Sequence, residues 1–433
     1  MASHAAPTGS QADASARGKR PPASALLFAT QVNLFAISLA ALWIPLNLIV
    51  LPGQVEELVP SGLRGTGIGA VTFIGVGIAA LVQPVAGRIT DRAPLSDRRR
   101  PFMVVPALAI TALLFALDLA PFYALLLLVY VAMQVLSNFA QAALQALIPD
   151  LVDERERGTA SGVKTALDAL GIVIGLAGVA LLLSIGANSL VLVGFLALLI
   201  GGGGLLAWLL VPPVEPAKDR AKSFREFLSF DAVKEPFVQM RKADAAFQRA
   251  VLMRFLFLVG LFMVQRFLLY YLDERFGVER PEEQSSLYLL VGFALAAIGA
   301  GAAGWLSDLL GRKLVLRVSI VLASAMLVVL ALAPVLAVAL VAGAGIALAA
   351  GAFQAANWAL LADSMEQQRG GEYFGLANLA TAGSGALAGL FGPLVDVFNA
   401  FSPALTYAVL FCIAAAVTLS SLTITRKIAE AKR

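Results

Sequence analysis

The chain has 433 residues, of which 59% are hydrophobic and only 14% are charged. Soluble proteins carry about 25% charged residues, so this chain has too few charges to cover soluble domains, and its mean hydropathy of +0.85 indicates lipid as its main solvent. A single cysteine, Cys412, and a single histidine, His4, argue against a disulfide framework, a metal centre and a Ser-His-Asp triad. The net charge of +4 gives no support to nucleic-acid binding, and we expect no cofactor.

About twelve segments are apolar and long enough, at roughly 20 residues each, to cross a bilayer as helices. We predict them at 25–51, 65–88, 101–120, 123–148, 158–185, 190–211, 247–272, 286–308, 313–333, 335–361, 373–398 and 403–425. The chain is therefore predicted to be an all-α membrane protein with twelve transmembrane helices. Two six-helix bundles, at 25–211 and 247–425, are joined by a polar cytoplasmic linker at 212–246, and the tails 1–24 and 426–433 are cytoplasmic, the first of them disordered.

Basic residues are distributed unequally between the two sets of loops. One side receives a large set, namely Arg17, Lys19, Arg20, Arg88, Arg92, Arg98, Arg99, Arg100, Arg155, Arg157, Arg312, Lys313, Arg317, Arg369, Arg426, Lys427, Lys432 and Arg433, together with the basic linker. The other side keeps only Arg64, Arg275 and Arg280. The positive-inside rule assigns the basic side to the cytoplasm. We predict a multi-pass protein of the cell membrane with both termini cytoplasmic.

Two local patterns occur twice, in the same order and at similar spacing. The segment 87–91 (Gly-Arg-Ile-Thr-Asp) recurs at 304–308 as Gly-Trp-Leu-Ser-Asp, and the segment that begins at Asp150 recurs at Asp363. Each pattern follows the same span of its half, the second or the fourth. The chain is therefore predicted to be a duplicated six-span unit, and transporters of this construction bind solute near the repeat interface.

The second copy reads Gly304-Trp-Leu-Ser-Asp308-Leu-Leu-Gly311-Arg312-Lys313, which resembles the G-x-x-x-D-x-x-G-R-[KR] signature of the major facilitator superfamily. The resemblance covers nearly the whole chain and implies a transporter. A glycine at a helix end lets a neighbouring helix approach closely, and the Asp can cap a helix or pair with Arg. We predict a gating motif of Gly87, Asp91, Arg92, Arg98, Arg99 and Asp150 in the first half and Gly304, Asp308, Gly311, Arg312, Lys313 and Asp363 in the second. The alternative is a topology anchor with no gating role.

The first copy differs from that signature because its loop is longer and ends in Arg98-Arg99-Arg100-Pro101-Phe102. This ending, and the segments 146–152 and 157–162, resemble the glycoside–pentoside–hexuronide symporters and the related sucrose carriers. That resemblance implies a sugar carrier. The sodium-coupled members of that branch use acidic residues in the second and fourth spans, but 65–86 and 123–148 contain no Asp or Glu. Their cation site is therefore not carried over to this chain.

Ionisable residues inside predicted spans are costly and are usually functional or paired. Lys164 and Asp168 lie four residues apart on one helix face, with Asp168 near the midplane. Either Asp168 carries a proton under the control of Lys164, or the two form a permanent structural ion pair. Arg254 is a third coupling candidate that could meet Asp168 or an anionic substrate, and Arg266 could meet Asp273 and the neighbouring Glu274; for both arginines, structural anchoring is the alternative.

Neutral polar residues in the spans are the candidates for a solute site. They are Gln31, Asn33, Trp43, Gln134, Asn138, Gln141, Gln354, Asn357 and Trp358. Amides bind hydroxyl groups, and indole rings stack on the apolar face of a sugar. The stripe formed by Gln134, Asn138, Gln141 and Gln145 falls on one helix face. It could equally be an interhelical hydrogen-bond seam.

The expected function is secondary active transport of a small organic solute by alternating access, as proton-coupled sugar symport by a monomer. A proton-coupled exporter of drugs or metabolites is the alternative that the same architecture serves. A membrane-embedded enzyme is disfavoured because the spans contain no histidine and no acidic cluster. A channel is disfavoured by the duplicated gating motif.

Overall fold

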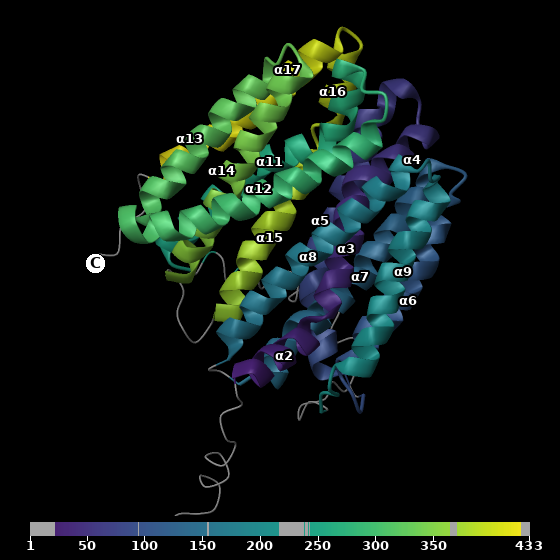
Figure 1. Ribbon diagram of the computed structural model, residues 1–433, viewed down its shortest axis with the longest axis vertical. Coiled ribbons are helices and arrows are strands. Elements are labelled where there is room, and N and C mark those ends of the chain that lie inside the picture. The colour runs from purple at the N-terminus through teal and green to yellow at the C-terminus, as the bar shows by residue number, and fades with distance from the viewer. Residues whose placement is uncertain are drawn as a thin grey trace, which may run out of the picture.

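The computed structural model describes residues 22–93, 95–153, 156–215, 243–363 and 370–425, and the isolated residues 238 and 241 (Figure 1). Every regular element in these residues is helical. The N-terminal half contains α2 (Pro22–Asn33), α3 (Phe35–Pro45), η1 (Leu46–Val50), α4 (Leu51–Leu58), η2 (Ser61–Leu63), α5 (Arg64–Arg92), α6 (Arg100–Asp118), α7 (Tyr123–Leu151), α8 (Arg157–Ser184) and α9 (Ser189–Leu210). The C-terminal half contains α11 (Ala245–Phe276), α12 (Pro281–Leu310), α13 (Arg312–Ala331), α14 (Leu336–Asp363), α15 (Gly370–Gly389), α16 (Gly392–Asn399), α17 (Pro403–Ser420) and α18 (Leu422–Thr425).

The predicted number of spans is confirmed within the described residues, where 12 helical segments are long and apolar enough to cross a membrane. Many large apolar side chains on them are exposed, among them Leu128, Leu198 and Val341. Such a surface fits contact with lipid. The predicted tails lie outside the described residues apart from the start of α2 at Pro22, and so does most of the predicted linker.

The first span is longer than predicted, because the chain stays helical through η1 and α4 to Leu58 instead of ending at Leu51. Pro52 and the glycine after it suggest a helix end in the sequence. The π-helical turn of η1 precedes them, and Pro52 falls in the first turn of α4. At the end of η1 the N–H of Leu51 donates to the carbonyl of Leu46 five residues earlier, so the wider π-helical turn lies directly before Pro52 and the chain continues as a helix past it.

The eleventh span, predicted as one helix over 373–398, is divided into α15 and α16 by a break at Leu390 and Phe391. Pro393 lies at the start of α16, where its fixed φ suits the first turn and its missing N–H is not needed. The break matters for function because α16 carries Asp396, described below.

The two halves lie side by side, purple to teal and green to yellow, and meet near α4 and α16 (Figure 1). Their other ends, at α2 and at the start of α13, lie apart. Within the contact, α5 packs against α15 and α16, and α8 packs against α12. One buried apolar cluster contains residues of both halves, such as Ile49 and Val264, whereas Phe247 and Phe353 belong to a cluster of the C-terminal half alone. The halves therefore share a core at one end only.

We call the end where α5 ends and α6 begins the basic end, and the opposite end the closed end. The described charges of the basic end include Arg88, Arg98, Arg99, Arg100, Arg157, Arg312, Lys313 and Arg317. The closed end is mainly acidic, with Glu56, Glu57, Asp118, Asp273, Glu274, Glu279, Glu282, Glu283 and Asp396 against Arg64, Arg275 and Arg280. The charge asymmetry expected from the sequence thus separates the two ends of the bundle.

Candidate functional site

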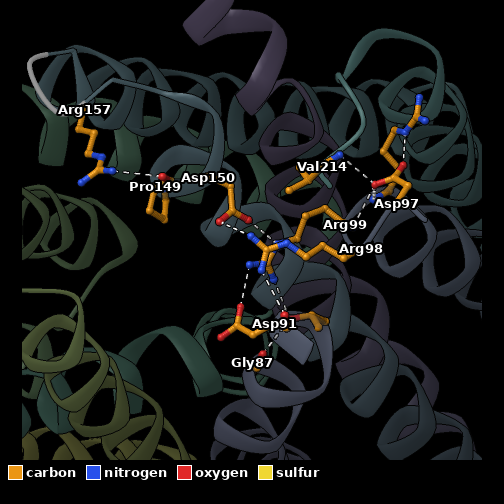
Figure 2. Close-up of polar contacts among 11 residues, drawn as sticks. Gly87, Asp91, Asp97, Arg98, Arg99, Pro149, Asp150, Arg157 and Val214 are labelled. Carbon is orange, nitrogen blue, oxygen red and sulfur yellow. Dashed lines mark hydrogen bonds and ion pairs between the residues drawn. The ribbon is translucent and has the colours of Figure 1, made fainter. Parts of the chain in front are cut away.

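The loop between α5 and α6 is organised around the buried side chain of Arg99, which is 2% exposed. Its Nε donates to Oδ2 of Asp150 at 2.7 Å and its Nη2 to Oδ1 of Asp91 at 2.7 Å, while Nη1 donates to Oγ1 of Thr90 at 3.2 Å (Figure 2). Asp91 lies at the end of α5 and Asp150 at the end of α7, and Arg99 directly precedes α6. One guanidinium therefore joins the ends of three helices.

Arg98 completes this network from the other side of Asp150. Its Nη2 donates to Oδ1 of Asp150 at 2.8 Å, and its Nη1 donates to the carbonyl of Asp91 at 3.1 Å. Four residues of the predicted gating motif, Asp91, Arg98, Arg99 and Asp150, are thus brought together. All four belong to the N-terminal half, so in this conformation the network joins helices within one half.

Asp97 anchors the same loop to the end of α9. Its carboxylate accepts hydrogen bonds from the backbone N–H groups of Arg99 at 3.2 Å and of Val214 at 3.3 Å, and it pairs with the guanidinium of Arg100. Burial works to raise the pKa of Asp97, but the hydrogen bonds from Arg100, Arg99 and Val214 outweigh it and hold the pKa below the usual value of 3.8. The carboxylate is therefore charged at neutral pH.

The Asp97→Asn variant is expected to lose stability in a pH-dependent way. A carboxylate whose pKa is depressed in the folded state stabilises that state above the unfolded pKa and loses this effect as the pH falls through the folded pKa. The thermal unfolding midpoint of the variant should lie below that of the original protein by a constant amount from pH 5 to 8. The difference should shrink below pH 3.8. A difference that is independent of pH down to the acid limit would contradict this role.

The second copy of the gating motif is described only in part. Gly311, between α12 and α13, has a positive φ of 88°, which favours glycine, and Nη1 of Arg312 donates to the carbonyl of Ala359 near the end of α14 at 2.8 Å. Lys313 is half-buried. The side chains of Arg92, Asp308 and Asp363 lie outside the described residues, so the pairing predicted for Asp308 stays a prediction.

Gly87 and Gly304 were predicted to receive a closely packed neighbouring helix, and in this conformation neither does. A Cβ atom added at either glycine would meet no described atom within 4 Å. The physical reason is that both glycines lie toward the basic end, where the two halves lie apart. The predicted close approach is wrong for this conformation.

The closed end is held by direct contacts between the two halves. Oδ1 of Asp396 on α16 accepts from the backbone N–H of Gly65 at 2.8 Å, and its Oδ2 accepts from the N–H of Thr66 at 2.6 Å. These N–H groups belong to the first turn of α5 and have no partner within their own helix. The carboxylate therefore caps α5 from the other half of the chain, and the positive end of the helix dipole strengthens the contact.

Paired glycines let α5 touch α15 and α16 backbone to backbone. A Cβ at Gly69 would lie 2.2 Å from the carbonyl oxygen of Gly389, and a Cβ at Gly65 would lie 2.6 Å from that of Gly392. Any side chain at these positions would push the helices apart, because real Cβ contacts are almost never shorter than 3.0 Å. Gly389 and Gly392 flank the break between α15 and α16, so this break lies directly against α5.

Two side chains of α11 also reach the first span across the closed end. Nη1 of Arg266 donates to the carbonyl of Asn47 at 3.0 Å, and the hydroxyl of Tyr270 donates to the carbonyl of Pro52 at 3.0 Å. The expectation that Arg266 meets Glu274 is wrong. Glu274 instead accepts from the hydroxyl of Tyr407 at 2.6 Å and from Asn399 at 2.9 Å.

Next to the contact of Arg266 with Asn47, a series of hydrogen-bonded side chains runs through the N-terminal half. Nε2 of Gln134 donates to the hydroxyl of Tyr130 at 2.7 Å, and that hydroxyl donates to Oδ1 of Asn47 at 2.7 Å. Trp43 packs edge-on against Tyr130, with ring centroids 6.0 Å apart, and its indole N–H donates to Ser137 at 2.6 Å. Two of the predicted solute-site residues, Trp43 and Gln134, thus adjoin the contact that Arg266 makes.

Other predicted solute-site residues make hydrogen bonds within the N-terminal bundle. Nδ2 of Asn33, which is fully buried, donates to the carbonyls of Ala29 at 2.9 Å and Ala160 at 3.2 Å. Gln31 donates to the carbonyl of Leu210, and Asn138 donates to the carbonyl of Gln134 one turn earlier. Gln141, on the same helix as Asn138, is half-buried. Gln31 and Asn33 therefore join α2 to α9 and to α8 within the N-terminal half.

The C-terminal half has its own polar cluster around Arg254, which is 3% exposed. Nε of Arg254 donates to Thr381 on α15 at 3.0 Å, Nη1 donates to Asn357 on α14 at 3.4 Å, and the guanidinium lies 4.3 Å from the centre of the Trp358 ring. Asn357 also donates to the carbonyl of Ala250 at 3.2 Å. Three sequence-predicted residues, Arg254, Asn357 and Trp358, therefore meet at one place.

Lys164 and Asp168 form the intrahelical ion pair that their spacing suggested, with Nζ 2.8 Å from Oδ2. The side chain of Asp168 is 38% exposed and that of Lys164 is 19% exposed. No ion pair joins Asp168 to Arg254 within the described part of the chain, so that suggested pairing does not occur in this conformation.

The model of the Major Facilitator Superfamily matches residues 23–393 of the chain. The chain belongs to this superfamily. It is accordingly a multi-pass membrane protein and a transporter of small molecules rather than an enzyme. A comparison with curated protein sequences gives no match.

Solved structures of major facilitator proteins share the fold. A mutant of the nucleoside transporter NupG superposes with a TM-score of 0.72 at 16% identity, covering 93% of this chain and 100% of NupG. A bacterial homolog of the human lysosomal transporter Spinster, in an inward-facing and occupied conformation, gives a TM-score of 0.70 at 17% identity, covering 95% of this chain and 97% of that one. At such identities the likeness concerns the fold alone, and the twelve-helix prediction is confirmed.

Sequence reasoning missed the residues with which this major facilitator protein joins its halves. Asp396 was read as part of an apolar span, and Tyr270 was not singled out. The glycines at 65, 67 and 69 were given no role in joining the halves. A usable signal was present, since closely spaced glycines occur at the start of α5 (65, 67 and 69) and at the break between α15 and α16 (389 and 392).

Proposed function

We propose that this protein is a proton-coupled symporter that carries a sugar-like solute by alternating access, working as a monomer in the cell membrane. The observation that carries the proposal is the one-sided closure of the bundle. The described hydrogen bonds between the halves, made by Asp396, Arg266 and Tyr270, all lie at the closed end. A transporter that exposes a central site to each side in turn requires such a closure to be reversible.

The basic end faces the cytoplasm in this proposal, because an excess of Lys and Arg marks cytoplasmic loops. Both termini are then cytoplasmic, and the conformation described above is open to the cytoplasm. In the opposite conformation the closed end separates and the basic end closes. Gly87 and Gly304, which now have open space beside them, then receive helices of the other half.

The sugar-like class of solute is supported by polar and aromatic side chains in the spans of both halves. Gln134, Tyr130 and Gln354 offer amide and hydroxyl groups that can bind hydroxyls in both directions, and Trp43 and Trp358 offer ring faces for a sugar. The loop ending in Arg98-Arg99-Arg100-Pro101-Phe102 is similar to that of the glycoside–pentoside–hexuronide branch. The fold neighbour NupG is a nucleoside transporter, and a nucleoside also contains a sugar ring.

Proton coupling is assigned to Asp168. The carboxylate is partly exposed and lies within the membrane-spanning part of α8, where Nζ of Lys164 is 2.8 Å from its Oδ2. Protonation of Asp168 releases Lys164, so the two residues exchange partners during each cycle. Symport follows when this exchange is linked to solute binding between the halves.

Uptake by purified protein in proteoliposomes tests the proposal, with a panel of mono- and disaccharides assayed with and without an inward proton gradient. We expect gradient-driven accumulation of a sugar that Asp168→Asn abolishes, while exchange of labelled for unlabelled sugar survives. Asp153→Asn is the matched control, because Asp153 is an exposed carboxylate at the basic end, and it should leave accumulation intact. Transport of lipophilic cations with no sugar movement would overturn the sugar assignment in favour of an exporter.

A further inference from the structure

Arg254 is a buried positive charge without a negative partner in the described part of the protein. The side chain is 3% exposed, and its two hydrogen-bond acceptors, Thr381 and Asn357, are both neutral. The nearest aromatic ring, Trp358, contributes only the attraction between a cation and a π face. A buried charge held by neutral groups alone is costly inside a membrane protein, and such residues mark binding sites or ion pathways.

The acidic residue expected for Arg254 is already engaged elsewhere. Asp168 pairs with Lys164 at 2.8 Å on α8, and no other ion pair of the described residues involves Arg254. Arg266, a half-buried arginine of α11, also lacks an ion pair among the described residues. Two positive charges of α11, Arg254 and Arg266, therefore have no ion-pair partner among the described residues.

The guanidinium of Arg254 is also incompletely used as a hydrogen-bond donor. Nε makes a short bond to Thr381 at 3.0 Å, whereas Nη1 reaches Asn357 only at 3.4 Å and Nη2 donates to no described residue. The edge formed by Nη1 and Nη2 has the spacing that binds a carboxylate or phosphate in bidentate fashion. One turn before Trp358, Oε1 of Gln354 is enclosed and accepts no hydrogen bond from the described residues, so it can take a hydroxyl of the same ligand.

We infer that Arg254 binds an anionic oxygen group of the transported solute, a carboxylate or a phosphate, through its Nη1–Nη2 edge. The inference rests on the proposed sugar-like substrate class and narrows it to an acidic sugar. Trp358 packs beside the anion-binding edge, and Gln354 accepts a ring hydroxyl. Arg254 is thus a specificity residue, because a neutral sugar leaves its charge uncompensated.

Arg266 does not serve this role, because its contact closes the transporter. Its Nη1 donates to the carbonyl of Asn47 in the other half. That carbonyl separates from Arg266 whenever the closed end opens. Replacing Arg266 should therefore change the transport of acidic and neutral solutes by the same factor, which makes Arg266→Gln the matched control.

Equilibrium binding to the purified full chain, measured by titration calorimetry, tests the inference with glucose, glucuronate, glucose 6-phosphate and benzoate. We expect glucuronate or glucose 6-phosphate to bind at least about tenfold more tightly than glucose, as bonds to a charged group predict. The preferred acidic sugar identifies the group as carboxylate or phosphate. Arg254→Gln should weaken its binding by about 10- to 100-fold and leave glucose binding within about threefold.

Arg254→Lys keeps the charge without the planar fork and should give an intermediate affinity, which preserves the test if Arg254→Gln does not fold. The inference is overturned if neither acidic sugar binds more tightly than glucose to the unaltered protein. It is also overturned if Arg266→Gln and Arg254→Gln change the ratio of the affinity for the acidic sugar to the affinity for glucose by the same factor. Glucose accumulation without acid preference leaves the proposed sugar transport intact. Arg254-dependent binding of benzoate without binding of any sugar supports the anion site and overturns the sugar class.

Discussion

The Gly69→Ala variant is expected to transport at least about tenfold more slowly, because the added methyl group prevents α5 from meeting α15. Its Cβ would lie 2.2 Å from the carbonyl oxygen of Gly389, a backbone atom that cannot rotate away. Overpacking of this kind costs about 1–3 kcal/mol. The cost falls only on the conformation in which the closed end is closed, so the population should shift about 5- to 150-fold toward the opposite conformation.

Distances between spin labels at Glu57 and Phe401 report this shift directly. Both side chains are exposed at the closed end, one on each half, and Cys412→Ser removes the single native thiol. We expect longer distances in Gly69→Ala. Gly77→Ala is the matched control on the same helix, because its Cβ would meet no described atom within 4 Å. Equal rates and equal distances in the two variants would show that the glycine contact does not govern the conformational change.

The Arg99→Met variant is expected to be strongly destabilised at the basic end. The substitution keeps an unbranched side chain of similar length but leaves Asp150, whose side chain is 15% exposed, with Arg98 as its remaining partner. Breaking a buried ion pair by removing one member costs about 3–5 kcal/mol. Asp91 is 57% exposed, so solvent screens its ion pair with Arg99 and that pair contributes less to stability. We therefore expect a loss of about 3 kcal/mol, near the lower limit of that range.

Thermal or denaturant unfolding of the purified protein in detergent measures this loss. Arg98→Met is the comparison, because Arg98 bonds only one carboxylate side chain and its own side chain is 18% exposed. Its effect should be clearly smaller. Adding Asp150→Asn to Arg99→Met should recover part of the stability, because the double variant no longer buries a carboxylate without its main partner. If the two arginine variants are equally stable, Arg99 is not the centre of the network.

This network gives the N-terminal half a rigid basic end. Arg99 joins α5, α6 and α7, and Asp97 joins the same loop to the segment after α9. A bundle whose helix ends are tied in this way can rotate as one body against the other half. In the proposed cycle, the contacts that must break and form are those between the halves, such as Asp396 with the first turn of α5.

Much of the architecture followed from the sequence alone. Lipid requires long apolar helices, because a backbone in hydrocarbon must satisfy its own hydrogen bonds, so the number of spans could be counted. Contacts between residues close in sequence were also predictable. Lys164 and Asp168 share a helix face because they are four residues apart, and the observed ion pair follows from that spacing.

The sequence also identified the charged residues of the gating motif, but not their pairing. Asp91, Arg98, Arg99 and Asp150 were recognised by pattern, whereas the choice of Arg99 as the buried centre depends on how α5, α6 and α7 end side by side. Amides were harder still. Asn33 and Gln134 both carry an amide side chain. Asn33 donates to the carbonyl of Ala160, whereas Gln134 donates to the hydroxyl of Tyr130, which in turn donates to Asn47.

Only the tertiary structure decided which surfaces of the two halves meet. The contacts of Gly69 with Gly389 and of Gly65 with Asp396 join residues more than 300 positions apart in the sequence. A helical pattern shows which residues share a face of a helix, but it does not show which other helix that face contacts. The same holds for Arg254, whose neutral surroundings come from α14 and α15. Composition and spacing determined a twelve-helix membrane protein with a duplicated basic motif. The contacts between the two halves decided which end of the bundle is closed. Such contacts, and the burial of a charge such as Arg254, arise only when segments distant in the sequence pack together.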